Sequence, residues 1–200
     1  MGRRFTAERQ RDPYYRAAQA GELRSRAAFK LSYLAERFPI FHVGDRVLDL
    51  GAAPGGWSIV ARACLRNGGT VTAVDPRPIE PMDGVEVLRG RVGDPTLVPR
   101  LGDQRFTVVL SDMSPSISGA YSTDHARSVD LVRQAFQLSI QVLEAGGNFV
   151  AKVFAGDLLA ELESELRPHF QRLVRTKPPA SRERSSELYL LGFGFRPYDG

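Results

Sequence analysis

Residues 46–57 read RVLDLGAAPGGW, and this stretch decides the fold. The aliphatic residues of Arg46–Leu50 are typical of a buried strand, and the glycines and alanines after them predict a turn that leads into a helix at Gly56. Small residues let a ligand approach the backbone closely, and glycine tolerates unusual dihedral angles. The stretch therefore predicts a strand, a ligand-binding turn and a helix.

The same alternation continues along the chain. Short runs rich in β-branched and aromatic residues predict strands at Arg46–Leu50, Thr70–Asp75, Val85–Leu88, Phe106–Ser111 and Asn148–Phe154, followed by two closing strands at Gln171–Arg175 and Glu187–Phe195. Helices are expected at Arg24–Phe38, Gly56–Arg66, Ala126–Glu144 and Asp157–Arg167. Strands that alternate with helices indicate a mostly parallel sheet. We expect one doubly wound α/β domain, with a basic segment at residues 1–23 and a core at residues 24–196.

Composition excludes several classes of protein. The chain has 200 residues, 42% of them hydrophobic, which is ordinary for a globular domain. No apolar run approaches the roughly 20 residues that span a bilayer. A single cysteine, Cys64, excludes an internal disulfide, and the scattered histidines predict no metal site. We expect a cytoplasmic protein that uses neither a metal nor a membrane.

Positive charge is concentrated at two places. Residues 1–30 carry a net charge of +5 and residues 167–187 a net charge of +4, although the whole chain carries only +4. This pattern favours a surface that binds a polyanion, and a solvated tail and loop are the alternative. The chain has 24 arginines but only three lysines, Lys30, Lys152 and Lys177. Because lysine can lose its proton when buried and arginine does not, the lysines are candidate acid–base groups.

The glycine turn indicates the kind of ligand. Asp75 ends the second predicted strand, where a carboxylate can accept hydrogen bonds from both ribose hydroxyls of an adenosine. The turn does not match the dinucleotide pattern G-x-G-x-x-G, and Pro54 lacks an N–H that could bind a pyrophosphate. A cofactor without phosphates fits better, and S-adenosylmethionine (SAM) is the candidate. A nucleotide and a purely structural turn remain alternatives.

Several separated motifs resemble the FtsJ-like RNA 2′-O-methyltransferases, and the match is nearest to the branch that acts on large-subunit ribosomal RNA. They are RSRAAFKL at residues 24–31, LDLGAAPGGW at 48–57, SDMSP at 111–115, SG at 118–119, KVF at 152–154, SR at 181–182 and RSSELY at 184–189. The resemblance covers roughly residues 12–196. It implies a Rossmann-like sheet of seven strands with the last strand antiparallel.

The resemblance also implies a catalytic tetrad of Lys30, Asp112, Lys152 and Glu187. A ribose hydroxyl is a poor nucleophile until its proton is removed or strongly hydrogen-bonded. We assign Lys152 as the base and Asp112 as the group that orients it. Lys30 and Glu187 are expected to hold the ribose.

The glycine turn, the resemblance and one departure from the family together give the residues expected to bind the cofactor. The set is Gly51, Ala53, Pro54, Gly55, Gly56, Trp57, Asp75, Arg91, Val92, Asp94 and Asp112. One position departs from the family, because Arg91 stands where an aspartate commonly contacts the adenine amino group. Arginine cannot accept a hydrogen bond. Either Asp94 takes that role, or the backbone of Arg91 and Val92 reads the adenine alone.

RNA is the expected partner, because DNA has no 2′-hydroxyl to methylate. The candidate phosphate-binding residues are Arg24, Arg26, Lys30, Arg182 and Arg184. We expect Phe29 to pack in the core rather than stack on a base. The resemblance implies a monomer that methylates a uridine of large-subunit (23S) rRNA in the ribosomal particle. A tRNA anticodon-loop methyltransferase, a non-catalytic ribosome assembly factor and a nucleotide-dependent oxidoreductase are the alternatives.

Overall fold

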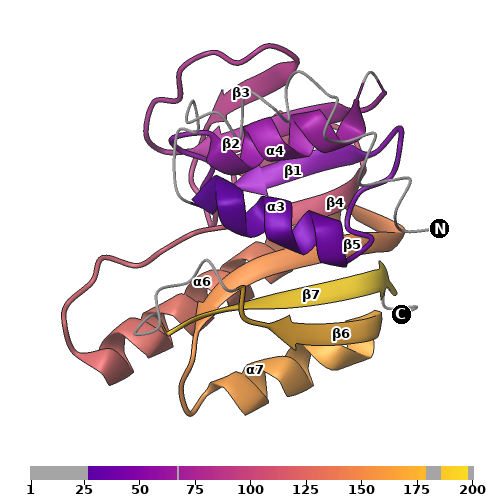
Figure 1. The fold of residues 1–200 in the computed structure, drawn as a ribbon. Helices are drawn as coiled ribbons and strands as arrows, with labels where there is room; N and C mark the ends of the chain where they lie inside the picture. Colours follow the sequence, from indigo (N-terminus) through magenta and orange to yellow (C-terminus); the bar gives the residue numbers. More distant parts are fainter. Residues whose placement is uncertain (1–26, 67, 179–185, 198–200) are drawn as a thin grey trace.

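The computed structural model describes residues 27–66, 68–178 and 186–197. Its centre is a seven-stranded sheet with the order β3-β2-β1-β4-β5-β7-β6 (Figure 1). The strands from β3 to β5 pair in parallel, whereas β7 pairs antiparallel with β5 and β6. The predicted doubly wound sheet with an antiparallel last strand is confirmed.

The strands are β1 (Arg46–Leu50), β2 (Thr70–Asp75), β3 (Val85–Arg89), β4 (Phe106–Ser111), β5 (Leu143–Phe154), β6 (Phe170–Thr176) and β7 (Glu187–Phe195). The helices are α3 (Ala27–Arg37), α4 (Gly56–Leu65), α5 (Leu97–Leu101), α6 (Tyr121–Val142) and α7 (Leu159–Leu166), and a 3₁₀ turn, η1, covers Arg167–His169.

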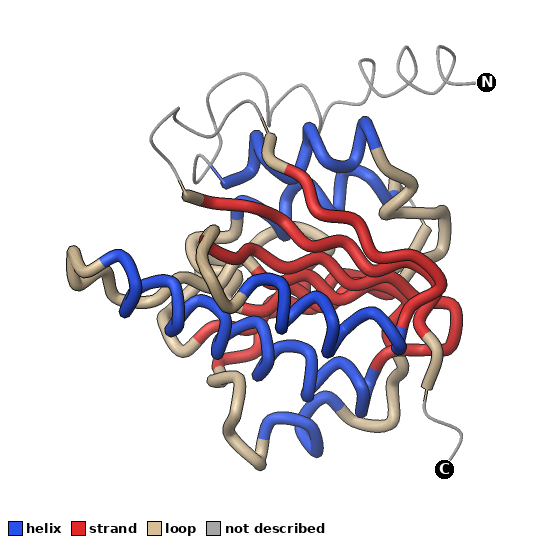
Figure 2. The backbone as a smooth tube through the Cα atoms, turned by 90° about the horizontal axis from the view of Figure 1, so that it is seen from below, coloured by secondary structure: helices blue, strands red, loops and turns tan. Residues whose placement is uncertain are grey.

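Two apolar clusters form, one on each face of the sheet, because successive strand side chains point to opposite faces. Val47 packs with α3 and α4, whereas its neighbour Leu48 packs with α5, α6 and α7. Helices therefore cover both faces, as Figure 2 shows. Leu31 and Leu34 hold α3 against the sheet and are fully buried. None of the helices in the described ranges is long and apolar enough to cross a bilayer.

The α6–β5 region differs from the prediction. Helix α6 begins at Tyr121 rather than Ala126, because Asp124 accepts hydrogen bonds from the backbone N–H groups of Ser118 and Gly119 and anchors the first turn. The helix ends at Val142, before the predicted Glu144, because Leu143 already pairs with Phe106 of β4. The following glycines lie within an irregular part of β5 and do not end the helix.

Candidate active site

The order of the strands in the sheet determines the order in which the residues of the site lie along one edge of it. The carboxyl ends of parallel strands meet at one edge, where ligands of open α/β sheets bind. A cavity of about 530 Å³ lies at this edge. It is lined by segments that follow β3, β2, β1 and β4, namely residues 90–92, 75–77, 51–57 (without 55) and 112–114, and by Leu131 and Gln134 of α6. The next strands along the sheet, β5 and β7, carry Lys152 and Glu187.

The turn after β1 forms the middle of the cavity. Gly51 and Ala52 both donate their backbone N–H to Val74 O, at 2.9 and 3.1 Å, which ties the turn to β2. Gly51 has a φ of +73°, and a Cβ on it would lie 2.5 Å from Met113 Cγ. Only glycine therefore fits at this position without a shift of its neighbour. The Ala53–Pro54 peptide is cis.

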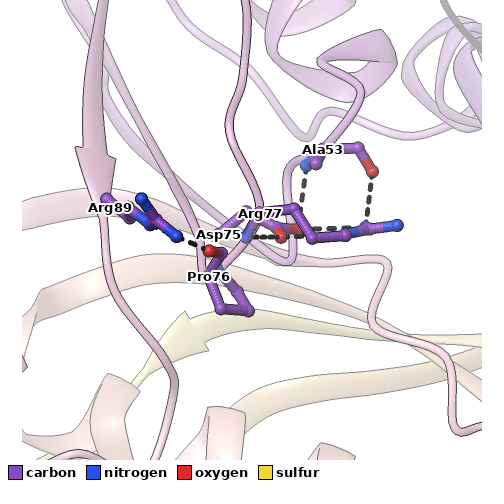
Figure 3. Close-up of polar contacts among 5 residues, drawn as sticks. All are labelled: Ala53, Asp75, Pro76, Arg77 and Arg89. Atoms are coloured by element: carbon purple, nitrogen blue, oxygen red, sulfur yellow. Dashed lines mark hydrogen bonds and ion pairs between the residues drawn. The ribbon is translucent and has the colours of Figure 1, made fainter.

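Asp75 lies at the end of β2 and is 2% exposed. Ala53 donates its backbone N–H to Asp75 Oδ2 at 3.0 Å. Arg77 donates its backbone N–H and Nε to Oδ1, at 2.8 and 3.0 Å, and Nη2 to Oδ2 at 3.2 Å (Figure 3). Burial opposes ionisation, but these hydrogen bonds from Arg77 and Ala53 outweigh it and lower the pKa of Asp75.

Arg77 was not predicted from the sequence. Its guanidinium also donates to Ala53 O at 2.9 Å, so that it bridges the turn after β1 and the end of β2. Arg89 donates to Pro76 O at 3.2 Å beside it (Figure 3). The carboxylate of Asp75 is therefore bound by protein donors on both oxygens.

The segment after β3 forms one end of the cavity. Arg91 and Val92 line it, as expected, whereas Asp94 does not. Asp94 Oδ1 instead accepts hydrogen bonds from the N–H and the hydroxyl of Thr96, each at 2.8 Å. Of the residues named in the two alternatives for this end, the structure brings Arg91 and Val92 to the cavity and not Asp94.

The four residues of the predicted tetrad form two neighbouring ion pairs. Lys152 Nζ lies 3.1 Å from Asp112 Oδ1 and donates to the backbone carbonyl of Asp112 at 2.9 Å. Lys30 on α3 pairs with Glu187 at the start of β7. Phe154 of β5 lies opposite Glu187 in the sheet, which places this pair beside the strand end that carries Lys152.

Asp112 joins the cavity to the tetrad, because it lines the cavity and contacts Lys152. Burial raises the pKa of Asp112, and the positive charges of Lys152 and Lys30 partly oppose this. Lys152 itself is only 7% exposed. A buried amine and a buried carboxylate in contact form a pair suited to proton transfer.

Tyr189 is a fully buried side chain beside the tetrad. It lies opposite Lys152 in the sheet and its ring is 5.8 Å from that of Trp57. Burial, with the negative charges of Asp112 and Glu187, raises the pKa of its hydroxyl, which therefore stays protonated. The strand alternation that places Tyr189 two residues after Glu187 was the available sequence signal.

Asp49 is a second group that the sequence analysis missed. It is fully buried in β1, and its Oδ2 accepts a hydrogen bond from Ser58 Oγ at 2.6 Å. Burial raises its pKa from 3.8 to about 7, an effect that the negative charges of Asp112 and Asp75 increase. An acid inside an aliphatic strand was the signal that could have identified it.

Some predicted residues contribute differently or cannot be placed. Gly55 does not line the cavity but caps α4, with a φ of +106°. Phe29 is 46% exposed, so the prediction that it packs in the core was wrong. The candidate phosphate-binding residues Arg24, Arg26, Arg182 and Arg184 lie outside the described residues.

Comparisons with known proteins agree with this geometry. The family model described as FtsJ-like methyltransferase matches residues 23–195. The chain is 44% identical to the ribosomal RNA large subunit methyltransferase E of Methanothermobacter thermautotrophicus, over 98% of this chain and 95% of that protein. It is 45% identical to the protein of the same name from Archaeoglobus fulgidus, over 92% and 96%. A crystal structure from Plasmodium falciparum, described as a ribosomal RNA methyltransferase, superposes with a TM-score of 0.80 at 26% identity and covers 88% of this chain and 100% of its own.

Proposed function

The chain belongs to the FtsJ-like methyltransferase family, and from this premise we propose that it methylates a ribose 2′-hydroxyl of large-subunit ribosomal RNA, with SAM as the methyl donor. The observation that carries the proposal is the buried Lys152–Asp112 pair beside the cavity formed by the turn after β1. Action as a cytoplasmic monomer is part of the same proposal and rests on the resemblance.

The cavity is suited to SAM. Its volume of about 530 Å³ is within the range of sites for small ligands. The glycine turn offers backbone but few side chains, which suits close approach of the ribose and the methionine chain of a cofactor that has no phosphates. When bound, SAM supplies a methyl group on a sulfonium, and its transfer forms an oxygen–carbon bond while the carbon–sulfur bond breaks and both electrons return to sulfur.

Lys152 is the base in this proposal. Lys152 donates a hydrogen bond to the backbone carbonyl of Asp112, and its Nζ lies 3.1 Å from the Asp112 carboxylate. An amine held in this place accepts the 2′-hydroxyl proton through its lone pair once it has lost its own extra proton. Asp112 holds the amine in place and is negative near the ammonium that forms. General-base catalysis of this kind accelerates reactions by about 10²- to 10⁴-fold.

Lys30 and Glu187 position the acceptor ribose. Their pair is partly exposed, with 14% and 23% of the side chains accessible, so solvent and substrate can reach it. A second cavity of about 350 Å³ is lined by Glu187, Ser186, Phe154, Ile117 and Tyr121, among other residues. Ile117 and Tyr121 are 67% and 59% exposed. The ring of Tyr121 can stack on an unpaired base, and Ile117 adds an apolar contact. This cavity supports the proposal that the acceptor nucleotide binds next to the tetrad.

The RNA class comes from the relatives. The two relatives described above are named for the large ribosomal subunit, and their lengths match this chain. The test therefore compares ribosomal RNA with tRNA directly.

The test is methyl transfer from isotopically labelled SAM to large ribosomal subunits, free large-subunit rRNA and tRNA, with mass spectrometry of the modified nucleoside. We expect a 2′-O-methyl nucleoside in the ribosomal RNA. Label confined to tRNA would support the proposed methyl-transfer reaction and overturn the proposed rRNA substrate. Binding of SAM without transfer to any of these RNAs would favour the non-catalytic assembly factor.

A further inference from the structure

The cavity end formed after β3 needs a group that recognises the adenine of the cofactor. The edge of adenine presents an amino group that donates and a ring nitrogen that accepts. Asp75 is bound on both oxygens by Arg77 and Ala53. Asp94 does not line the cavity, and Arg91 has no acceptor on its side chain. An acceptor for the amino group must come from another residue.

Gln134 of α6 supplies such an acceptor. It lines the cavity, and its Nε2 donates a hydrogen bond to Asp130 Oδ2 at 2.7 Å, one helical turn earlier. A carboxylate only accepts hydrogen bonds, so Asp130 fixes which end of the amide is nitrogen. The amide oxygen, Oε1, therefore points away from Asp130. Within the part of the chain that the structure describes, Oε1 accepts no hydrogen bond.

The position of Oε1 is on the correct side of the cavity. A Cβ on Gly93 would lie 3.3 Å from it, so the amide oxygen lies over the turn that begins with Arg91 and Val92. Among the described residues, the backbone N–H groups of Arg91 and Val92 have no acceptor within the protein. Val92 is nevertheless buried, at 7% exposed. Unpaired donors at a buried turn indicate a ligand that accepts from them.

We propose that Gln134 Oε1 accepts the hydrogen bond from the adenine amino group, while the Arg91–Val92 backbone donates to the adenine ring nitrogen. This pair reads adenine and rejects hypoxanthine, whose edge has the donor and acceptor reversed. Asp130 acts as a positioning residue that holds the amide in this orientation. The inference deepens the proposed function and depends on SAM being the cofactor.

The test is calorimetric titration with S-adenosylhomocysteine and with its inosine analogue. The variants are Gln134→Leu, which removes the acceptor at similar size, and Asp130→Ala, which releases the amide. Gln137→Leu is the matched control, because Gln137 is exposed on the same helix and does not line the cavity. Circular dichroism confirms that each variant is folded.

We expect Gln134→Leu to weaken binding of the adenosine ligand by about tenfold and to change binding of the inosine ligand little, so that the discrimination falls by about tenfold. Asp130→Ala lowers the discrimination by a smaller factor, and Gln137→Leu leaves it unchanged. Wild-type discrimination in Gln134→Leu would overturn the role of Gln134 and leave the proposed function intact. Failure of the wild-type protein to bind S-adenosylhomocysteine would instead overturn the cofactor, and with it the proposed function.

Discussion

The stability of this fold should depend on pH through Asp49. The carboxyl group is fully buried in β1, and only Ser58 donates a side-chain hydrogen bond to it. Its Oδ1 has no hydrogen-bond partner among the described residues. Burial raises its pKa from 3.8 to about 7, so the folded protein holds a proton there that the unfolded chain has already lost.

The sign and size of the effect follow from that difference. Between about pH 4 and pH 7 the folded state binds more protons than the unfolded state, and the free energy of unfolding must fall as the pH rises. A change from 3.8 to about 7 corresponds to about 4 kcal/mol in total. Between about pH 5 and pH 8 the expected fall is about 3 kcal/mol.

Asp49→Asn removes this titration. Urea unfolding of both proteins should be measured from about pH 5 to about pH 8. Over this range the free energy of unfolding of the variant, relative to that of wild type, should increase by about 3 kcal/mol. The difference between the two proteins cancels other titrating groups. A constant cost of burying the amide changes this difference by the same amount at every pH, so it does not affect how the difference depends on pH.

Asp124→Asn is the control. Hydrogen bonds from Ser118 lower the pKa of Asp124, so its carboxyl is ionised in both states across this pH range. Its difference from wild type should therefore not change with pH. A pH-independent difference for Asp49→Asn as well would show that Asp49 is ionised in the folded protein, and would refute the reasoning.

Three further predictions concern the cavity and the tetrad. Gly51→Ala should lower the free energy of unfolding by about 2 kcal/mol in urea unfolding, because it strains a φ of +73° and brings a Cβ 2.5 Å from Met113 Cγ; an unchanged midpoint would contradict this. Arg77→Leu should tighten SAM binding in calorimetry by about threefold or more, since it exposes acceptors on the carboxylate that ends β2; weaker binding would show that the guanidinium contacts the cofactor. Lys30→Met should raise the pKa of Asp112, because it removes a positive charge, and should move the acid limb of the pH–rate profile to higher pH. Lys30→Arg keeps the charge and should leave that limb in place. An acid limb at the same pH in Lys30→Met would show that ionisation of Asp112 does not control it.

The regular parts of the fold were predictable because local pattern and tertiary position agree. β1, β2, β4 and β7 have the predicted bounds, since each is an apolar run with clear turn residues beside it. The boundary between α6 and β5 was not predictable, because pairing of Leu143 with Phe106 overrides the local helical pattern. Such competition between strand and helix is decided by tertiary contacts.

Positions in the candidate site were predictable where a short sequence motif identifies the residue directly. Asp112 directly follows β4 and Lys152 lies near the end of β5, and the pairing of these two strands brings the side chains together. Gln134 could not be found in this way, because its orientation depends on Asp130 and on a turn that follows a different strand. The pairing of Arg77 with Asp75 likewise depends on side-chain geometry that composition and spacing do not contain.

Single-turnover methyl transfer by Lys152→Met tests the central claim most directly. The assay uses saturating SAM and large ribosomal subunits, and calorimetry with S-adenosylhomocysteine measures cofactor binding separately. Because Lys152 does not line the cavity, cofactor affinity should stay close to that of wild type. The rate should fall by about 10²-fold or more as the base is lost. A rate near that of wild type would contradict the assignment of Lys152 as the base and the mechanism built on it.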